Sequence, residues 1–194
     1  MIAYVSGNIT FKSPAYVIIE SAGLGYQVNI SLGTYSKIQS LSACKLHTYF
    51  AVREDAQVLY GFYDIEEKEM FVMLISVSGV GPSTAMMILS STSTEDLQRA
   101  IAHDDIKLLE HIKGIGPKTA KRLTLELKDK IAKIPQKLRT GAVQSNNKHD
   151  EALSALVMLG FSRVSADGVL QRVLKQAEGN ESVEEIIKQA LRVI

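Results

Sequence analysis

One eight-residue pattern occurs twice in this chain, and it limits the folds that the chain can adopt. Ser78 to Ala85 reads SGVGPSTA, and Lys113 to Ala120 reads KGIGPKTA, 35 residues later. Each copy separates two apolar segments, so each predicts a helix, a tight hairpin and a second helix. Proline after the second glycine suits the first turn of a helix, because the amide hydrogen that it lacks would have no partner there. We therefore expect helices to begin at Pro82 and Pro117.

The start of such a helix attracts anions, because its backbone N–H groups are unpaired and its dipole adds partial positive charge. Glycine permits positive φ and leaves the backbone without a Cβ, so a phosphate oxygen can approach closely. The two segments resemble a tandem pair of helix-hairpin-helix motifs, which hold the DNA backbone without recognising bases. The alternative is that each Gly-x-Gly-Pro is only a tight turn between helices. The matching Thr84/Thr119 and Ala85/Ala120 favour the DNA interpretation.

Side chains next to these glycines add charge and hydrogen bonds to the predicted DNA site. The two copies differ where Ser83 in the first corresponds to Lys118 in the second. We therefore expect the first hairpin to hold a phosphate more weakly. The predicted DNA-binding residues are Gly79, Gly81, Ser83, Thr84, Gly114, Gly116, Lys118, Thr119, Lys121 and Arg122.

Basic charge is concentrated on the second hairpin, although the net charge of the 194-residue chain is only +1. Between Ile112 and Lys133 there are seven basic and two acidic residues, whereas the segment from Glu95 to Glu110 has five acidic and two basic residues. A charged run is often only a solvated surface. Its position beside Gly114 and Gly116 favours an electrostatic footprint for nucleic acid.

Other ligand-binding patterns do not match. A phosphate-binding P-loop requires Gly-x-x-x-x-Gly-Lys-Ser/Thr, but a proline separates Gly116 from Lys118. A dinucleotide fingerprint requires a third glycine and a preceding strand, and neither hairpin has them. We expect no cofactor and no metal. Cys44 is the only cysteine, so no intrachain disulfide can form, and no apolar run approaches the length of a membrane span. These features predict a soluble, intracellular protein.

The first 63 residues are rich in β-branched and aromatic residues interrupted by glycine and proline, which predicts a small barrel of five or six strands. The clearest hairpin runs from Lys45 to Tyr63 and has Glu54-Asp55-Ala56 at its tip. Two neighbouring acidic residues at a turn commonly have no role beyond forming a solvent-exposed turn. A catalytic acid pair would need one partly desolvated carboxyl group, which an exposed tip does not provide.

Helical patterns follow. Residues 64–134 are predicted to form one helical unit containing both hairpins, and the polar residues 135–149 a flexible linker. Residues 150–194 predict a three-helix bundle, in which Gly160 ends the first helix and Ser182 with Glu185 begins the third. The bundle resembles ubiquitin-associated domains. Leu159 and Phe161 either fill its core, together with Leu153, Leu156 and Val157, or contact a partner protein.

The whole chain resembles the bacterial RuvA family of Holliday junction branch-migration proteins. The most specific matches are the paired hairpins and the segments Val52 to Gln57 and Leu59 to Phe62. The resemblance implies an OB-like N-terminal barrel, a tandem helix-hairpin-helix domain and a C-terminal domain. It also implies that the protein is a cytoplasmic homotetramer that takes part in recombination and DNA repair. Either one tetramer or two would bind an open four-way junction.

The resemblance further assigns roles to parts of this sequence. Glu54 and Asp55 match the family's acidic pin, whose negative charges would repel phosphates near the crossover. The C-terminal domain would recruit the hexameric motor ATPase RuvB, and the junction resolvase RuvC is a further candidate partner. This chain would then be a non-catalytic DNA-binding subunit without a cofactor.

Two alternatives remain open from the sequence. A helix-hairpin-helix nuclease or glycosylase would need clustered carboxylates or a catalytic residue beside a pocket. Asp104 and Asp105 are adjacent, but we expect them to be successive helical residues, which do not share a face. A protein-interaction adaptor would not bind DNA at all.

Overall fold

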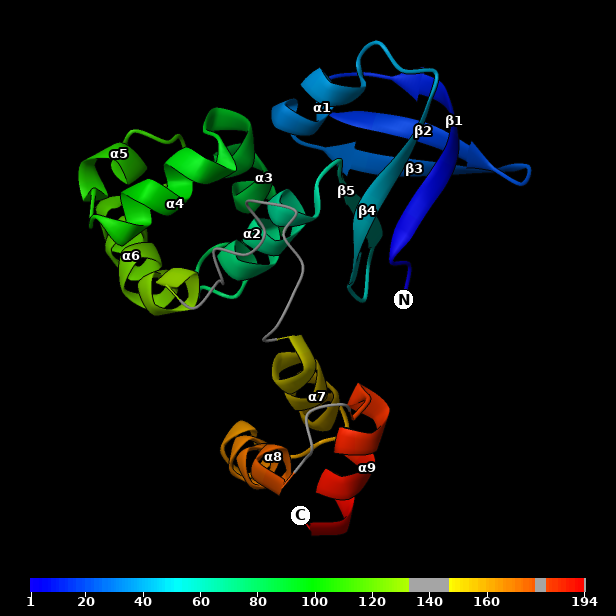
Figure 1. Cartoon of the computed structure of the whole chain (residues 1–194). Coiled ribbons are helices and arrows are strands. Elements are labelled where there is room, and N and C mark those ends of the chain that lie inside the picture. Colours follow the sequence, from blue (N-terminus) through cyan, green and yellow to red (C-terminus); the bar gives the residue numbers. More distant parts are fainter. Residues whose placement is uncertain (133–146, 177–180, 194) are drawn as a thin grey trace. The chain divides into compact units, whose positions relative to one another are not determined.

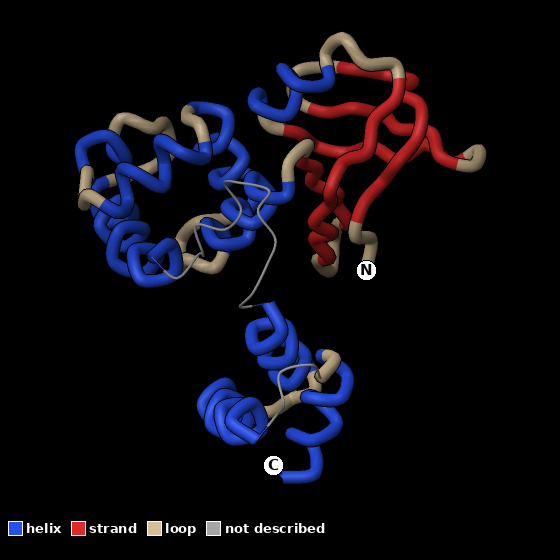
Figure 2. The backbone as a smooth tube through the Cα atoms, viewed as in Figure 1, coloured by secondary structure: helices blue, strands red, loops and turns tan. Residues whose placement is uncertain are grey.

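The structure is a computed structural model that describes residues 1–132, 147–176 and 181–193. It contains two compact units, Met1–Pro135 and Gln136–Ile194 (Figure 1). In the first unit, strands gather in a barrel at the N-terminus and helices make up the remainder (Figure 2). The elements of this unit are β1 (Tyr4–Lys12), β2 (Tyr16–Ser21), β3 (Leu24–Ile30), α1 (Leu32–Ile38), β4 (Ala43–Val52), β5 (Gln57–Phe62), α2 (Ile65–Ile75), α3 (Pro82–Ser91), α4 (Thr94–Ala102), α5 (Ile106–Glu110) and α6 (Pro117–Ala132).

The five strands close into a barrel in the order β1-β2-β3-β5-β4, with β4 returning to β1. Neighbouring strands are antiparallel except β3 and β5, which are parallel. β-branched and leucine side chains at alternate positions fill the interior, including Val17, Ile19, Val28 and Leu46, which are completely buried. Alternation of this kind turns one face of each strand toward the interior. The closed barrel of five strands confirms the predicted small barrel.

A short helix, α1, lies in the segment that the sequence suggested was all strand and turn. Ser31 caps it, since its Oγ accepts a hydrogen bond from the backbone N–H of Thr34 at 2.9 Å. Gly33, one of the glycines that interrupt this strand-rich segment, lies in the first turn of the helix. The helix is only seven residues long and depends on tertiary contacts, because isolated helices of this length are unstable.

The barrel and the first long helix share a core. The ring of Phe71, on α2, is completely buried, and its centroid lies 5.0 Å from that of Phe62 and 5.3 Å from those of Tyr49 and Tyr60. Tilted aromatic pairs at these separations are favourable. This shared core explains why residues on both sides of Tyr63 form one compact unit.

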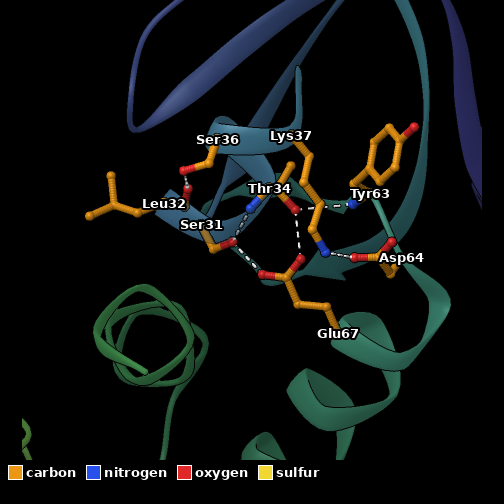
Figure 3. A network of polar contacts seen from close by, with 8 residues as sticks. All are labelled: Ser31, Leu32, Thr34, Ser36, Lys37, Tyr63, Asp64 and Glu67. Atoms are coloured by element: carbon orange, nitrogen blue, oxygen red, sulfur yellow. Dashed lines mark hydrogen bonds and ion pairs between the residues drawn. The ribbon is translucent and has the colours of Figure 1, made fainter. Parts of the chain in front are cut away.

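Buried polar contacts add a second connection between α1 and α2 (Figure 3). Glu67 is 6% exposed, and its two carboxylate oxygens accept hydrogen bonds from Ser31 Oγ and, at 2.7 Å, from Thr34 Oγ1. Beside them, the ammonium group of Lys37 pairs with the carboxylate of Asp64. Burial lowers the pKa of Lys37, but the hydrogen bond with Asp64 and the charges of Asp64, Glu67 and Glu95 together outweigh it, so the pKa of Lys37 is raised.

The second unit is the predicted three-helix bundle, formed by α7 (Asn147–Met158), α8 (Arg163–Gln176) and α9 (Val183–Val193). Gly160 follows the first helix with φ +101°, and Ser182 and Glu185 form the expected capping box, with Ser182 N donating to Glu185 Oε2 at 2.8 Å. α7 begins at Asn147, so the last three residues of the predicted linker 135–149 are helical. Residues 135–146 of that prediction lie outside the described part of the chain.

Candidate nucleic-acid interface

The two hairpins have the same backbone conformation. Gly79 has φ +90° and Gly114 has φ +92°, a region that residues with a Cβ rarely adopt. The duplicated sequence therefore folds into a duplicated structure. The backbone hydrogen bonds also repeat, from Val80 N to Val77 O and Ile115 N to Ile112 O, both at 3.0 Å, and from Ala85 N to Gly81 O and Ala120 N to Gly116 O, both at 2.9 Å.

Gly81 and Gly116, the second glycines of the hairpins, stand directly before α3 and α6. Gly81 has φ −86° and ψ 170°, which any residue can adopt, and Gly116 is not among the positive-φ positions. A Cβ at either position would have no atom within 4 Å. Within this unit, neither backbone strain nor internal packing requires glycine at these two positions. Both helix starts are therefore open to an external group, as a phosphate-binding backbone requires.

Side chains around these glycines are accessible. Ser83 and Lys118 are exposed at equivalent positions in the first turns of α3 and α6, and Thr84 and Thr119 are half-buried. Lys121 is exposed one turn further along α6. Among residues 1–132, neither Lys118 nor Lys121 forms an ion pair with an acidic side chain, so their charge is available to an anionic ligand.

Arg122, also predicted as a phosphate contact, has protein partners. Its Nη1 donates to the backbone carbonyl of Ser78 at 3.1 Å, and its Nε lies 3.8 Å from a carboxylate oxygen of Glu126. Ser78 directly precedes Gly79. The side chain of Arg122, on the α6 helix of the second repeat, thus reaches the loop of the first hairpin.

Part of the basic run that follows the second hairpin is used inside the protein. Lys128 pairs with Asp104, and Lys130 donates to Ser76 Oγ at 2.9 Å. Asp104 has φ +55° and lies in the turn before α5, while Asp105 caps that helix by accepting from Leu108 N at 3.1 Å. The expectation that these two aspartates are successive helical residues is wrong. Each has a structural partner.

The tip of the β4–β5 hairpin carries the two predicted pin residues. Its turn closes through a 2.8 Å hydrogen bond from Arg53 N to Ala56 O, and Glu54 and Asp55 lie between them with exposed side chains. The turn occurs at the predicted place, because the strands end at Val52 and resume at Gln57. It presents two negative charges at one exposed point of the barrel.

In the C-terminal unit, the residues predicted to pack together separate into two groups. Leu153 and Leu156 are buried, whereas Val157 is 43% and Leu159 is 61% exposed, so the prediction that all four share the packed face is wrong. α7 ends at Met158, one residue before Leu159, and Leu159 therefore leaves the helical face. Phe161 is half-buried and packs against the core. Leu159 is thus the more accessible of the two predicted partner-binding residues.

In residues 1–132, 147–176 and 181–193, no group of three or more His, Cys, Asp or Glu side chains is arranged to hold a metal ion. Over the same residues, no helix combines the length and apolar character needed to cross a membrane.

Family models match three consecutive segments of the chain. They are described as the RuvA N terminal domain at residues 1–61, a SAM-like helix-hairpin-helix tandem at residues 71–129, and the RuvA C-terminal domain at residues 147–194. The tandem model covers both hairpins, all of α3, and α6 as far as residue 129. The order agrees with the barrel, the duplicated hairpins and the three-helix bundle.

Curated relatives match over essentially their full lengths. Proteins named Holliday junction branch migration complex subunit RuvA are 42% identical in Cytophaga hutchinsonii, over all of both chains, and 45% identical in Christiangramia forsetii, over 99% of each chain. The relative of that name in Bacteroides fragilis is 44% identical, also over 99% of each chain. With this identity over the whole length, and with the domain models in the same order as the observed units, the chain belongs to the RuvA family.

Proposed function

We propose that this protein binds four-way DNA junctions by their shape and acts as the non-catalytic DNA-binding subunit of a branch-migration complex. The observation that carries the proposal is the pair of hairpins with matching glycine conformation and backbone hydrogen bonds, whose second glycines leave the starts of α3 and α6 unobstructed. The family membership and the names of the relatives agree with it.

The hairpins would hold DNA through its phosphates. Backbone N–H groups at the two helix starts donate to phosphate oxygens, while Lys118 and Lys121 supply charge and Thr119 a hydroxyl group. Contacts of this kind position a protein on DNA but carry no base sequence information. Binding is therefore expected to depend on junction shape and to weaken steeply with salt, with a slope of about −0.9 in log K against log salt for each neutralised phosphate.

We further propose that the protein assembles as a homotetramer in the cytoplasm and that its C-terminal bundle recruits the motor ATPase RuvB. One copy offers two hairpins, so four related copies would supply contacts to all four arms of a junction. The exposed side chain of Leu159 supports a partner surface on the bundle. ATP hydrolysis would then be supplied by the partner.

A direct test compares the full-length protein on an immobile four-way junction and on a linear duplex made from the same strand sequences. We expect the junction to be bound more tightly and the salt dependence to be steep. The mass of the free protein tests the tetramer, and incubation of the same DNAs with Mg²⁺ tests for cleavage. Equal affinity for junction and duplex, or cleavage of either DNA, would contradict the proposal.

Neutralising the pin is predicted to reduce selectivity rather than binding. In the variant Glu54→Gln/Asp55→Asn, two exposed charges near phosphates disappear without loss of side-chain volume, so repulsion of DNA falls. We expect junction affinity to stay the same or rise and duplex affinity to rise more, as measured by titration of both DNAs. The control is Glu66→Gln, an exposed carboxylate on α2 away from this turn. A large loss of junction affinity in the folded pin variant would argue against a repulsive role.

Making the first hairpin resemble the second is predicted to strengthen binding. Ser83→Lys introduces the residue that occupies the equivalent position 118, on an exposed first-turn site. We expect tighter junction binding and a salt dependence steeper by about 0.9 for each phosphate that the new lysine neutralises. Ser154→Lys places the same charge on an exposed position of the C-terminal unit and should leave the slope unchanged. An unchanged slope in Ser83→Lys would mean that no phosphate lies beside the first hairpin.

A further inference from the structure

We infer that Arg122 and Met87 form a reciprocal brace that holds the two hairpins at a fixed separation. Arg122 is therefore a positioning residue and not a phosphate ligand. This inference rests on the proposed function, because the separation matters only if both hairpins bind the same DNA.

The brace follows from the repeat. Met87 and Arg122 occupy equivalent positions, each five residues after the proline that begins its helix. Arg122 hydrogen-bonds to the hairpin of the first repeat, and Met87 lies beside the hairpin of the second. Arg122 Nη1 donates to the carbonyl of Ser78 at 3.1 Å, and the Sδ of Met87 lies 3.4 Å from the place where a Cβ of Gly114 would stand. Ser78 immediately precedes Gly79, which corresponds to Gly114. The two contacts therefore reach adjoining positions in the two loops.

Each contact restrains the loop that it reaches. The hydrogen bond to the Ser78 carbonyl fixes the peptide group that leads into Gly79, and the orientation of that peptide influences the direction of the amides that follow. At the second hairpin, the thioether of Met87 stands beside Gly114, with its Sδ 3.4 Å from the place where a Cβ would be. A shift of the first loop would break the Arg122 hydrogen bond, and a shift of the second loop toward α3 would meet Met87. Preorganisation of this kind favours binding because less freedom is lost when DNA is bound.

The surroundings of Arg122 also oppose a direct role in phosphate binding. Its guanidinium group already donates to Ser78, and Glu126, one turn along α6, lies 3.8 Å from its Nε. The charge of this guanidinium group is therefore already shared with a carbonyl and a carboxylate. The neighbouring Lys121 is exposed and forms no ion pair among residues 1–132. The two adjacent cations of α6 therefore have different roles.

Salt dependence separates these roles. A side chain that neutralises a phosphate contributes to the slope of log K against log salt, whereas a side chain that only positions the backbone lowers affinity by the same factor at every salt concentration. The matched variants are Arg122→Ala and Lys121→Ala, which remove adjacent cations from exposed sites on one helix. Alanine is the strongest helix former, so both variants should keep α6 intact.

We expect Arg122→Ala to weaken junction binding by about three- to tenfold, the effect of losing one charge-assisted hydrogen bond at a partly exposed site, with no change of slope. Lys121→Ala should reduce the steepness of the slope by about 0.9 for each phosphate lost. Met87→Ala changes no charge and should also weaken binding without affecting the slope. Circular dichroism and the thermal unfolding midpoint establish that each variant is folded.

A reduced slope in Arg122→Ala, like that of Lys121→Ala, would overturn the inference by making Arg122 a phosphate ligand. Unchanged affinity in the folded Arg122→Ala would overturn it as well. If Arg122→Ala does not fold, Met87→Ala decides the matter, and wild-type affinity in that variant overturns the brace. Failure of the wild-type protein to prefer a junction over duplex would refute the proposed function instead, so the two failures are distinguishable.

Discussion

Replacing Gly81 and Gly116 together by valine is expected to abolish junction binding while the protein stays folded. A Cβ at either position meets no protein atom within 4 Å, and the backbone at Gly81 lies in a region that valine adopts readily. The added methyl groups would instead occupy the space through which a phosphate oxygen approaches the helix start. Loss of the charge-assisted hydrogen bonds at one hairpin costs about 3 kcal/mol, or about a hundredfold in affinity, and two hairpins are affected.

The measurement is a junction titration at low salt, accompanied by thermal unfolding followed by circular dichroism. Gly168→Val is a matched control, because Gly168 in α8 also has no atom within 4 Å of a Cβ but belongs to the C-terminal unit. We expect that control to bind the junction like the wild type. A folded double variant with wild-type affinity would refute phosphate binding through these two backbone positions.

Gly79 and Gly114 are less suitable for this test. Their φ values of +90° and +92° strain any residue that has a Cβ. A substitution there would change the loop as well as its surface, so reduced binding would have two causes. The structure thus separates four glycines that the sequence presents as equivalent: one of each pair forms the turn, and the other leaves room for a ligand.

The features that the sequence predicted well are local. Pro82 and Pro117 begin helices as expected, and Ser182 accepts a hydrogen bond from Glu185 N at 3.2 Å, as the predicted capping box requires. The barrel was also predictable, because β-branched and aromatic residues alternate along its strands. These signals depend on neighbours a few residues away. One sequence is sufficient to show them.

The features that the sequence did not reveal depend on distant partners. Glu67 lies in the charged segment Glu66-Glu67-Lys68-Glu69, which indicates a solvated helix face, yet it is buried against residues more than thirty positions earlier. The partner of Arg122 is 44 residues away in sequence. Comparing the repeats shows that Arg122 corresponds to Met87, but no local signal predicts that each lies at the opposite loop.

The exposed apolar residues of the C-terminal bundle illustrate the same limit. Helical spacing placed Leu153, Leu156 and Val157 on one face, but an apolar stripe gives no information about how much of it neighbouring helices cover. Here α8 and α9 cover Leu153 and Leu156 and leave Val157 partly exposed. Leu159 follows the end of α7, where helical periodicity no longer applies.

Glu67→Ala is expected to destabilise the N-terminal unit by about 3 kcal/mol, among the largest effects of any single substitution in this chain. Ser31 Oγ accepts from Thr34 N, and Thr34 Oγ1 accepts from Tyr63 N at 3.0 Å, so each hydroxyl group has its hydrogen free for Glu67 (Figure 3). Alanine removes the acceptor of both buried hydroxyl hydrogens and leaves a cavity.

The free energy of unfolding, measured by urea denaturation of the full chain, tests this expectation. Glu66→Ala is the matched control, because the neighbouring carboxylate is exposed and its loss should change stability by no more than about 0.5 kcal/mol. Glu67→Gln should fall between them, since an amide offers one acceptor oxygen where the carboxylate offers two. The backbone N–H of Leu32, on α1, also donates to Ser90 Oγ near the end of α3, at 3.1 Å. Loosening α1 should therefore disturb the connection between the barrel, which carries the pin, and the helix that begins at Pro82. We therefore expect Glu67→Ala to lose discrimination between junction and duplex even below its unfolding midpoint. Equal stability of the Glu66 and Glu67 variants would show that these buried hydrogen bonds contribute little to the fold.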